Sequence, residues 1–438
     1  DWKPNVYGQC KSWLDDGLKP RAVTRDLEWG VPVPLDSANG KVLYVWFDAP
    51  IGYISSSIEW AKNNNKNWEK YWKDPETELI HFIGKDNIVF HCIIFPAMLK
   101  AEGSYILPKN VPANEFLNLE GDKISTSKNW AVWLPDYLID FPNQQDVLRY
   151  VLTSNAPETK DNDFTWKDFQ AKNNNELVAI FGNFINRVVV LTNKYYDGLI
   201  PKSNNILDID KEVLNLIDLS VLKIEKSIHK FRFREACNEL INIARIGNKY
   251  LADQEPWKII KEDEARVETV MHVSLQISAI LSVISEPFLP NTSKKLQDIL
   301  NYKAHLIEWT WDNLNKNKIL INTGVTINNA ELLFTKIEDK QIDFQISKLN
   351  ASKKCKSIIS KKQEISYADF SKLNLKIGTI LEAKKIKKSK KLLELKVDIK
   401  NEIRSIVSGI AKSYDPSEII GNKVVVLINL ESKVIAGV

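Results

Sequence analysis

The sequence is poor in cysteine, and its cysteines lie too far apart to form a compact site. Cys10, Cys92, Cys237 and Cys355 include no Cys-x-x-Cys pair. This spacing argues against a zinc knuckle and against a disulfide framework, and it fits the reducing cytosol. We also find no signal peptide and expect no apolar run long enough to span a bilayer. We therefore expect a cytoplasmic protein with no membrane partner and no metal site in these residues.

A catalytic triad and a carboxylate dyad are also missing from the sequence. The chain begins at Asp1 without an initiator methionine and in mid-pattern, and it stops at Val438 soon after a strand-like run. We therefore expect a fragment that lacks part of its first domain and part of its last one.

The proportions of hydrophobic and charged residues are those of a globular protein. The chain's 438 residues are 44 % hydrophobic and 26 % charged, and that balance is typical of soluble domains. The length is too great for one ordinary core, so we expect roughly two to four domains. The formal charge of +4 is modest, but lysines concentrate near the C-terminus.

Residues 1–164 alternate strand-like runs with helical ones. The expected elements are strands at Lys41–Phe47 and Glu78–Ile83, and helices from Ile51 to about Asn63 and from Phe90 through Leu99. Strand, turn and helix in this order predict a doubly wound α/β sheet, whose ligands bind at the carboxyl ends of its strands.

The rest of the chain changes character twice. Residues 165–335 predict a helical bundle, with helical periods at 172–197, 211–227, 231–252, 264–283 and 290–301. Residues 336–364 are rich in Lys, Ser and Gln and predict a linker or a charged helix. Residues 365–438 predict a small barrel, with strands at Leu375–Leu381, Leu392–Ile399, Ser405–Ile410 and Lys423–Ile428.

A polar loop, Gly121-Asp122-Lys123-Ile124-Ser125-Thr126-Ser127-Lys128-Asn129, follows residues 115–119, which include the apolar Phe116, Leu117 and Leu119. A mobile lysine on such a loop can place positive charge where a phosphate becomes more negative during a reaction. Ser125, Thr126 and Ser127 supply hydroxyls beside Lys123. The alternative is a solvated surface turn, because short polar motifs often match by chance.

A strand-to-helix turn carries Trp46, Ala49, Pro50 and Tyr53, and His91 lies on the helix after the second strand. A Trp and a Tyr around small residues could wall a slot for an unbranched apolar side chain, and sulfur–aromatic contact would favour a thioether. The alternative is that these aromatic residues belong to the core.

Gly84 and Asp86 directly follow the second strand. Glycine lets a ligand approach the backbone, and a carboxylate there can accept hydrogen bonds from ribose hydroxyls. The alternative is an ordinary turn with an N-capping Asp.

Three residues of the predicted bundle suit nucleic acid. Asn183 and Arg187 lie at i and i+4, on one helix face, where an amide and a guanidinium can read a base edge and hold a phosphate. Trp257 lies at a helix junction, where an exposed indole could stack on an unpaired base. The alternative for Trp257 is packing against the next helix.

A dense basic run lies beside a predicted strand of the barrel. Its lysines are Lys384, Lys385, Lys387, Lys388, Lys390 and Lys391. On the edge of a small barrel this run suits a nucleic-acid backbone, although charge runs are more often solvated faces.

In order and spacing, these pieces resemble the methionyl-tRNA synthetases. The matching stretches are Y-V-W-F-D-A-P-I-G-Y (44–53), H-F-I-G-K-D (81–86) with F-H (90–91), F-P-A-M-L (95–99), K-I-S-T-S (123–127), D-x-D-F-x-W (161–166), G-N-F-I-N-R (182–187) and Q-E-P-W (254–257). The last segment, with K-I-G-T-I (376–380), L-K-V-D (395–398) and I-V-S-G-I-A-K (406–412), is similar to the oligonucleotide-fold (OB-fold) domain that many bacterial members append.

The resemblance implies a class I aminoacyl-tRNA synthetase made of the second half of a Rossmann-like catalytic domain, an α-helical anticodon-binding bundle and a partial OB-fold. In this family methionine's carboxylate attacks the α-phosphate of ATP, which binds with Mg²⁺, and the adenylate is then transferred to the terminal adenosine of tRNA. No protein nucleophile is required, because positioning and charge stabilisation supply the rate.

The resemblance also assigns roles to residues. Trp46, Ala49, Pro50, Tyr53 and His91 would line the methionine pocket; Gly84 and Asp86 would face the ribose, and Leu117 the adenine, of ATP. Lys123 would act on the phosphates, together with Ser125, Thr126 and Ser127. Asn183, Arg187 and Trp257 would read the CAU anticodon, and the lysine run would hold the tRNA backbone. The C-terminal domain of this family often dimerises, which implies a homodimer.

The sequence departs from the family pattern in three ways. A His-x-Gly-His-type turn and a cysteine-bearing zinc insertion are absent, so we expect both, and any structural Zn²⁺, upstream of Asp1. Thr126 stands where many members have a second lysine, and Asn87 stands where an apolar residue is common.

Two other functions compete with this one. The chain as given could be a non-catalytic tRNA-binding protein built from the bundle and the OB-fold. A synthetase for leucine or valine is disfavoured by the Trp46/Tyr53 slot and by the set Asn183, Arg187 and Trp257.

Overall fold

The chain folds into two compact units. The computed structural model describes residues 2–317, 319–357, 366–386, 389, 391–431 and 433, without the side chains of Trp46, 315–317 and 352–357. Unit 1 is Asp1–Lys354 and unit 2 is Cys355–Val438.

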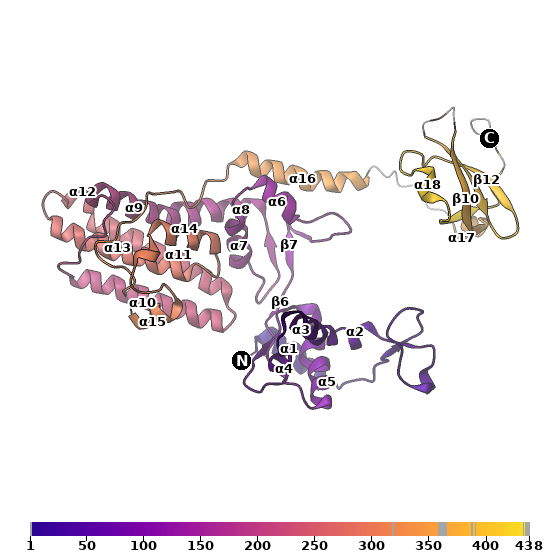
Figure 1. Cartoon of the computed structure of the whole chain (residues 1–438), viewed down its shortest axis with the longest axis horizontal. Coiled ribbons are helices and arrows are strands. Elements are labelled where there is room, and N and C mark those ends of the chain that lie inside the picture. The colour runs from indigo at the N-terminus through magenta and orange to yellow at the C-terminus, as the bar shows by residue number, and fades with distance from the viewer. Residues whose placement is uncertain are drawn as a thin grey trace. The chain divides into compact units, whose positions relative to one another are not determined.

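The first part of unit 1 is a mixture of short strands and helices (Figure 1). Its elements are α1 Pro4–Asp15, β1 Thr24–Arg25, η1 Asp36–Ala38, β2 Val42–Leu43, α2 Val45–Asp48, α3 Ile51–Asn64, α4 Glu69–Trp72, β3 Leu79–Ile80, β4 Ile83–Gly84, η2 Lys85–Asn87, η3 Phe90–Ile94, α5 Phe95–Glu102, β5 Pro108–Asn110 and β6 Ala113–Asn114. The pairs β3–β5 and β4–β6 are parallel, as expected for strands that are followed by a turn and a helix. The prediction of a strand over Lys41–Phe47 is wrong, because only Val42 and Leu43 find a partner strand and residues 45–48 are helical.

A second small sheet carries the polar loop. Its strands are β7 Leu117–Leu119, β8 Asp122–Lys123 and β9 Asn162–Phe164, in the order β8-β7-β9. The helices α6 Leu134–Asp140 and α7 Gln145–Ser154 lie between β8 and β9 in the sequence. Leu119, Trp130 and Phe164 belong to the same buried cluster as the helices of the bundle, so the sheet and the bundle share one core.

The bundle begins in one continuous helical run and goes on through long helices (Figure 1). Its elements are α8 Trp166–Lys172, η4 Asn173–Gly182, α9 Asn183–Tyr196, α10 Asp208–His229, α11 Phe233–Gln254, α12 Pro256–Ile259, α13 Glu264–Ile284, α14 Pro290–Ile299, η5 Tyr302–Ala304 and α15 Trp311–Asn317. In α11 small and apolar residues recur at helical spacing and face the core. A Cβ at Gly247 would lie 2.6 Å from the Phe184 ring, so this glycine lets α11 and α9 approach closely.

Helix α13 is the central helix of the bundle. By length and composition alone it could cross a membrane, but 89 % of its most apolar stretch is buried inside the structure. Ser274 and Ser278 satisfy their buried hydroxyls on backbone carbonyls four residues earlier. The expectation that no apolar run has the length of a span is therefore corrected for this helix, whose apolar surface packs within the bundle.

A buried ionic network joins three helices of the bundle. The Asp210 carboxylate is fully buried and accepts two hydrogen bonds from the Arg266 guanidinium, at 2.6 and 2.7 Å. The Tyr250 hydroxyl donates to it at 2.6 Å. Burial would raise the pKa of Asp210, but the hydrogen bonds from Arg266 and Tyr250 hold it below its ordinary value. The carboxylate is therefore charged and fully paired.

Helix α16, Asp339–Ser357, occupies much of the segment for which a linker or a charged helix was predicted. Lys348 Nζ lies 2.7 Å from Asp140 of α6, and Gln345 donates to the same carboxylate at 2.9 Å. Gln170 of α8 donates to Asp339 at 2.8 Å. Up to residue 351 this segment is therefore a helix docked on unit 1, and residues 358–365 lie outside the described chain.

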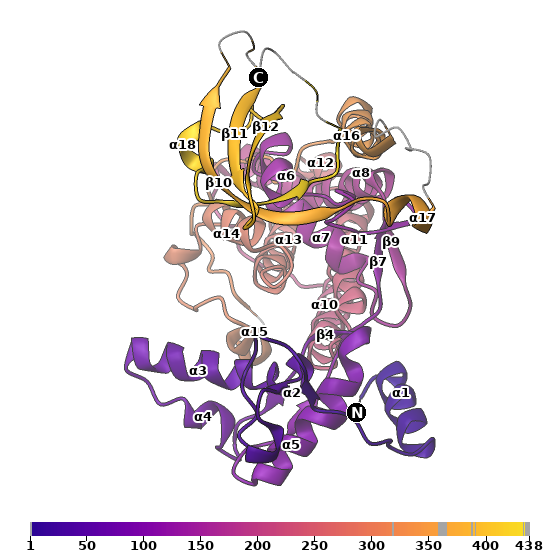
Figure 2. The same cartoon turned by 90° about the vertical axis from the view of Figure 1, so that its right-hand side faces the viewer.

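Unit 2 is a four-stranded antiparallel sheet with two short helices. Its elements are α17 Tyr367–Phe370, β10 Leu375–Lys385, β11 Leu393–Asp398, β12 Ile403–Ser408, α18 Pro416–Ile419 and β13 Lys423–Leu427, and the strand order is β12-β11-β10-β13. Leu393, Leu395 and Val397 alternate inward along β11. Figure 2 shows α18 beside the long, curved β10. The four predicted strands are all present, with β10 longer than predicted and β12 two residues earlier.

The Asp210 network generates a stability prediction. Arg266→Met leaves the buried Asp210 carboxylate without its cationic partner, so we expect the free energy of unfolding to fall by about 3–5 kcal/mol. Because the pKa of Asp210 is depressed in the folded state, the loss should be full above the ordinary carboxylate pKa and should shrink as pH falls through the folded-state value. Urea denaturation over a pH series measures both effects.

The control is Lys211→Met, which removes an exposed pair with Asp208. That variant should change stability by about 0.5 kcal/mol or less. Equal losses in the two variants would contradict the assigned role of the network.

Candidate functional site

The polar loop begins as a tight hairpin, which we call the Lys123 hairpin (β7, Glu120-Gly121 and β8, residues 117–123). Asn118 pairs with Lys123 and Leu119 with Asp122. Glu120 and Gly121 both have positive φ, 49° and 78°, the conformation that two-residue hairpin turns require and that favours glycine. Leu117, the predicted adenine neighbour, is half-buried in β7 and packs against the main core.

The remainder of the loop closes on itself. The backbone groups of Ser125 and Trp130 exchange two hydrogen bonds of 2.9 Å, and the N–H of Asn129 donates to the carbonyl of Thr126 at 3.0 Å. The hydroxyls of Ser125 and Ser127 lie 3.2 Å apart. The buried Trp130 indole donates to the carbonyl of Leu119 at 3.0 Å. The loop is thus anchored at its far end by an aromatic side chain.

Lys123 lies on the exposed side of the hairpin. Its ammonium is 5.6 Å from the centre of the Phe116 ring. Lys85, from the Gly84–Asp86 turn, lies 4.3 Å from the centre of the same ring. Within the described residues no carboxylate pairs with Lys123, whereas Lys85 pairs with two. The fold therefore brings lysines from two separate motifs to one aromatic ring.

The Gly84–Asp86 turn follows the carboxyl end of strand β4, where a doubly wound fold places its ligands. A Cβ at Gly84 would lie 2.8 Å from a carboxylate oxygen of Asp86, so a larger residue would have to displace that carboxylate. Lys85 was not among the predicted site residues. The sequence feature that could have identified Lys85 is its place inside the H-F-I-G-K-D stretch.

Tyr53 and His91, predicted to share a slot, are in direct contact. The Tyr53 hydroxyl lies 2.9 Å from His91 Nε2, and His91 Nδ1 lies 3.0 Å from the carbonyl oxygen of Asn87. Because a carbonyl only accepts, Nδ1 carries the proton and Nε2 accepts from Tyr53 in the neutral ring. Asn87 acts here through its backbone, so its departure from the family pattern does not remove this hydrogen bond.

Ala49 and Pro50, two other predicted slot residues, immediately precede α3, the helix that carries Tyr53. Ala49 is exposed and ends α2, and Pro50 is buried and precedes α3. The side chain of Trp46 lies outside the described part of the chain, so its predicted place in the slot stays a prediction.

His81 is a member of this cluster that sequence reasoning missed. Its ring centre lies 5.3 Å from that of His91 and 5.7 Å from that of Tyr53. Burial, with a smaller contribution from His91, lowers the pKa of His81 to about 4. His81 follows β3 directly, so its position at a strand end was the available signal.

The three predicted nucleic-acid residues of the bundle also form a cluster. The Arg187 guanidinium lies 5.0 Å from the centre of the Trp257 ring, within cation–π range. The Asn183 amide, one turn earlier on α9, donates to Asn248 at 3.4 Å. Trp257 keeps 38 % of its surface exposed. Burial lowers the pKa of Arg187.

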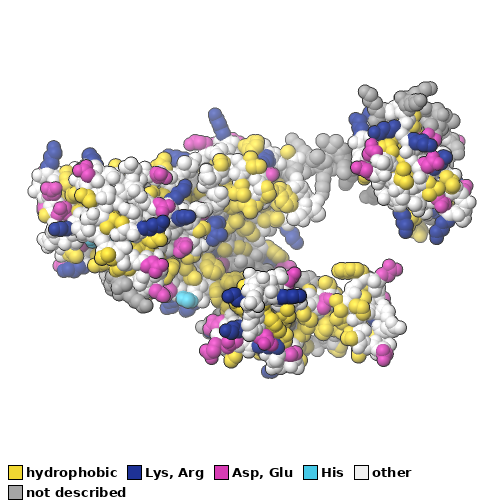
Figure 3. Space-filling view, viewed as in Figure 1, with side chains coloured by type: hydrophobic (Ala, Val, Ile, Leu, Met, Phe, Trp, Pro, Cys, Tyr) yellow, Lys and Arg dark blue, Asp and Glu magenta, His cyan; other side chains and the backbone are white. Residues whose placement is uncertain are grey.

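The lysine run lies at the end of β10, and Lys387, Lys388 and Lys390 fall outside the described residues. Lys384 pairs with Glu382 at 2.9 Å and Lys385 with Asp415 at 3.4 Å. These pairs offset part of the positive charge that the sequence suggested. Apolar and basic side chains both reach the surface of unit 2 (Figure 3).

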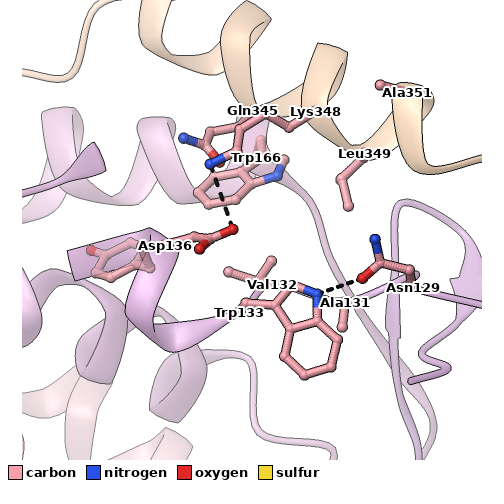
Figure 4. A pocket seen from close by; sticks show the side chains of 11 residues that line it. Asn129, Ala131, Val132, Trp133, Asp136, Trp166, Gln345, Lys348, Leu349 and Ala351 are labelled. Carbon is pink, nitrogen blue, oxygen red and sulfur yellow. Dashed lines mark hydrogen bonds and ion pairs between the residues drawn. The ribbon is translucent and has the colours of Figure 1, made fainter. Parts of the chain in front are cut away.

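A cavity of about 300 Å³ lies beside the loop, between α6 and α16. Trp133 forms part of its wall and donates to Asn129 at 2.8 Å, and Asp136 lies 3.8 Å from Lys348 across it (Figure 4). The cavity places α16 next to the end of the polar loop. Over the described residues, no group of three or more His, Cys, Asp or Glu side chains could hold a metal ion.

Three family models match successive parts of the chain. They are described as "tRNA synthetases class I (M)" over residues 1–189, "Anticodon binding domain of methionyl tRNA ligase" over residues 200–354 and "Putative tRNA binding domain" over residues 375–438.

Curated relatives match along the whole chain. The chain is 61 % identical to the methionine–tRNA ligase of Flavobacterium johnsoniae, 62 % to that of Flavobacterium psychrophilum and 57 % to that of Bacteroides fragilis strain YCH46. Each alignment covers 100 % of this chain, but the chain spans only 66 %, 64 % and 64 % of the length of these relatives.

Solved structures share the fold. The free form of Mycobacterium tuberculosis methionyl-tRNA synthetase matches with a TM-score of 0.65 and 23 % identity, covering 77 % of this chain and 64 % of that one. The same enzyme with methionyl-adenylate matches with a TM-score of 0.63 and 24 % identity, covering 76 % and 64 %. Identity along the whole chain, the order of the three domain families and the shared fold agree: the chain belongs to the methionyl-tRNA synthetase family.

Proposed function

We propose that the protein is a methionine–tRNA ligase, which activates methionine with ATP to methionyl-adenylate and transfers the methionyl group to tRNA. The observation that carries this proposal is identity of about three residues in five along the whole chain to relatives named methionine–tRNA ligase. The geometry supports it, because Tyr53 and His91 are in direct contact, the Gly84–Asp86 turn lies at the end of β4, and Lys85 of that turn and Lys123 approach the same Phe116 ring.

The methionine slot would have a fixed wall. Nδ1 of His91 donates to the carbonyl of Asn87, which sets the orientation of the imidazole ring beside the thioether. The Tyr53 hydroxyl fixes the second ring nitrogen at 2.9 Å. Ala49 and Pro50 would border the slot, and Trp46 would close it.

ATP with Mg²⁺ would bind between the Gly84 turn and the Lys123 hairpin. Gly84 and Asp86 would meet the ribose, and Leu117 would lie near the adenine. Lys123 carries no described carboxylate partner, so its charge is available to the phosphates. The hydroxyls of Ser125, Thr126 and Ser127 would assist, and Lys128 is a further cation on the same loop.

The bundle would read the CAU anticodon through Asn183, Arg187 and Trp257. Trp257 keeps 38 % of its surface exposed for contact with a base, and the Arg187 guanidinium lies 5.0 Å from the centre of its ring. The lysine run would add contacts to the tRNA backbone.

Removing the charges of the lysine run should flatten the salt dependence of tRNA binding. An unchanged slope would mean that the run is a solvated face instead.

A homodimer through unit 2 completes the proposed partners. Ile377 and Val425 face each other across β10 and β13, and 66 % and 70 % of their surfaces are exposed. An apolar pair this exposed suits a second copy of the chain. Sedimentation equilibrium of Ile377→Glu tests the proposed homodimer.

Any structural zinc would lie upstream of Asp1. A cytoplasmic location fits the proposed function.

The second candidate is a non-catalytic tRNA-binding protein built from the bundle and the OB-fold, which match an anticodon-binding and a tRNA-binding family model. Methionine-dependent ATP–pyrophosphate exchange separates the two. We expect no exchange from this chain alone, and retardation of tRNA by it. Exchange by this chain alone would exclude the second candidate.

Lys123→Met tests the proposed catalytic lysine. In a form of the protein that spans the length of its relatives, we expect the exchange rate to fall by about 10²–10³-fold, the scale of losing one charge-stabilising donor. Lys100→Met, an exposed lysine of α5, is the matched control and should leave exchange unchanged. Equal rates in the two variants would remove Lys123 from the reaction.

Trp257→Ala tests the anticodon surface. We expect discrimination between the methionine anticodon and its single-base variants to weaken by about 1–3 kcal/mol, the scale of one base stack. Binding of tRNA anticodon variants measures it, and Trp60→Ala, an exposed indole of α3, serves as control. Unchanged discrimination in Trp257→Ala would return this residue to a packing role.

A further inference from the structure

The D-x-D-F-x-W stretch at 161–166 has no role in the proposed function so far. Asp161 and Asp163 are two residues apart around β9, so their side chains emerge on the same side. Strand β9 runs parallel to β7, with Asn118 opposite Asp163 and Leu119 opposite Phe164. The two aspartates therefore lie alongside the Lys123 hairpin.

Each aspartate holds one end of that hairpin by a backbone N–H. Asp161 accepts from the N–H of Phe116, just before β7, at 2.9 Å. Asp163 accepts from the N–H of Gly121, in the turn, with both carboxylate oxygens at 3.0 Å. In return, Glu120 of the turn accepts from the N–H of Trp166 at 2.7 Å. The motif thus frames the hairpin at its base and at its tip.

Asp161 also reaches the nucleotide-side turn through Lys85. Lys85 Nζ lies 2.6 Å from Asp161 and 2.8 Å from Glu115. The other oxygen of Glu115 accepts from Asn5 at 2.8 Å, so the carboxylate is itself fixed. Hydrogen bonds to Asp161 and then Glu115 raise the pKa of Lys85. Lys85 therefore stays a cation across the physiological range.

The Phe116 ring is a neighbour of both Lys85 and Lys123. Lys85 stands 4.3 Å and Lys123 5.6 Å from its centre. The backbone of Phe116 is held by Asp161, so the ring, both lysines and the hairpin base form one connected arrangement. A shift of Lys85 would be passed to the ring against which Lys123 rests.

We propose that Lys85 and Asp161 are positioning residues, which join the Gly84–Asp86 turn to the Lys123 hairpin and so fix where Lys123 meets the phosphates. Only the contact between Lys123 and the phosphates rests on the proposed function. The ion pair between Lys85 and Asp161 is a property of the folded chain. Neither residue needs to touch substrate for this role.

The chain offers substitutions that separate charge from shape. Asp161→Asn keeps an oxygen that can accept from Phe116 but loses the charge that holds Lys85. Lys85→Met keeps the length of the side chain and loses its charge, while Lys85→Arg keeps the charge. Lys109→Met is the matched control, because Lys109 forms an exposed pair with Glu78 on the same part of unit 1.

Limited trypsin digestion of this chain tests the connection between the Gly84–Asp86 turn and the Lys123 hairpin without a measurement of enzyme activity. Mass spectrometry would follow cleavage after Lys123 and Lys128. We expect both cuts to be roughly fivefold faster in Lys85→Met and Asp161→Asn, because the hairpin opens more often. Lys85→Arg and Lys109→Met should cleave like the wild type, and thermal melting checks that all variants fold. Wild-type cleavage rates in both Lys85→Met and Asp161→Asn would overturn the inference.

Exchange kinetics in the protein at the length of its relatives provide the second measurement. A misplaced lysine lowers the rate of the chemical step, so we expect kcat to fall about 10- to 100-fold in both variants with KM for methionine unchanged. The double variant should be no worse than either single one. Faster cleavage with wild-type kcat would overturn the positioning role. Absence of exchange in the wild-type protein would instead refute the proposed function.

Discussion

A hairpin with three residues in one strand and two in the other cannot hold its shape in water, and the Lys123 hairpin is of this kind. It persists because β9, more than 40 residues further along the chain, pairs with β7, and because Trp130 donates to the carbonyl of Leu119. The position of Lys123 depends on this long-range pairing, whereas the Gly84–Asp86 turn depends on the pairing of β4 with β6. The loop that carries Lys123 is therefore a product of tertiary structure rather than of its own residues.

The same pairing connects the hairpin to the bundle. Phe164 of β9 and Trp166 pack edge to face, with ring centres 5.4 Å apart, and both belong to the core that continues through α9, α11 and α13. A second contact joins the two parts of unit 1. The ring centres of Phe82 and of Phe231, at the turn before α11, lie 5.3 Å apart. The helix that begins at this turn ends beside Trp257.

The sequence predicted the helices well and the strands of the first part poorly, for physical reasons. Helices such as α10, α11 and α13 satisfy their hydrogen bonds locally, so periodicity is enough to find them. The apolar run at Lys41–Phe47 has strong strand propensity, but a strand also needs a partner, and only Val42 and Leu43 have one. His81 and Lys85 were missed because their partners, Tyr53, Glu115 and Asp161, come from distant segments. The roles assigned by motif to Lys123, His91 and Trp257 remain predictions.

The contact between Arg187 and Trp257 has a consequence for entropy. Because the guanidinium already lies against the indole, the ring is restricted in the folded chain before any base arrives. Binding then has little side-chain freedom left to remove, and the cost of ordering that ring was met during folding. If Trp257 stacks on an anticodon base as proposed, a fixed ring would limit the orientations in which that base can bind, and rigidity would add to the selectivity that hydrogen bonds provide.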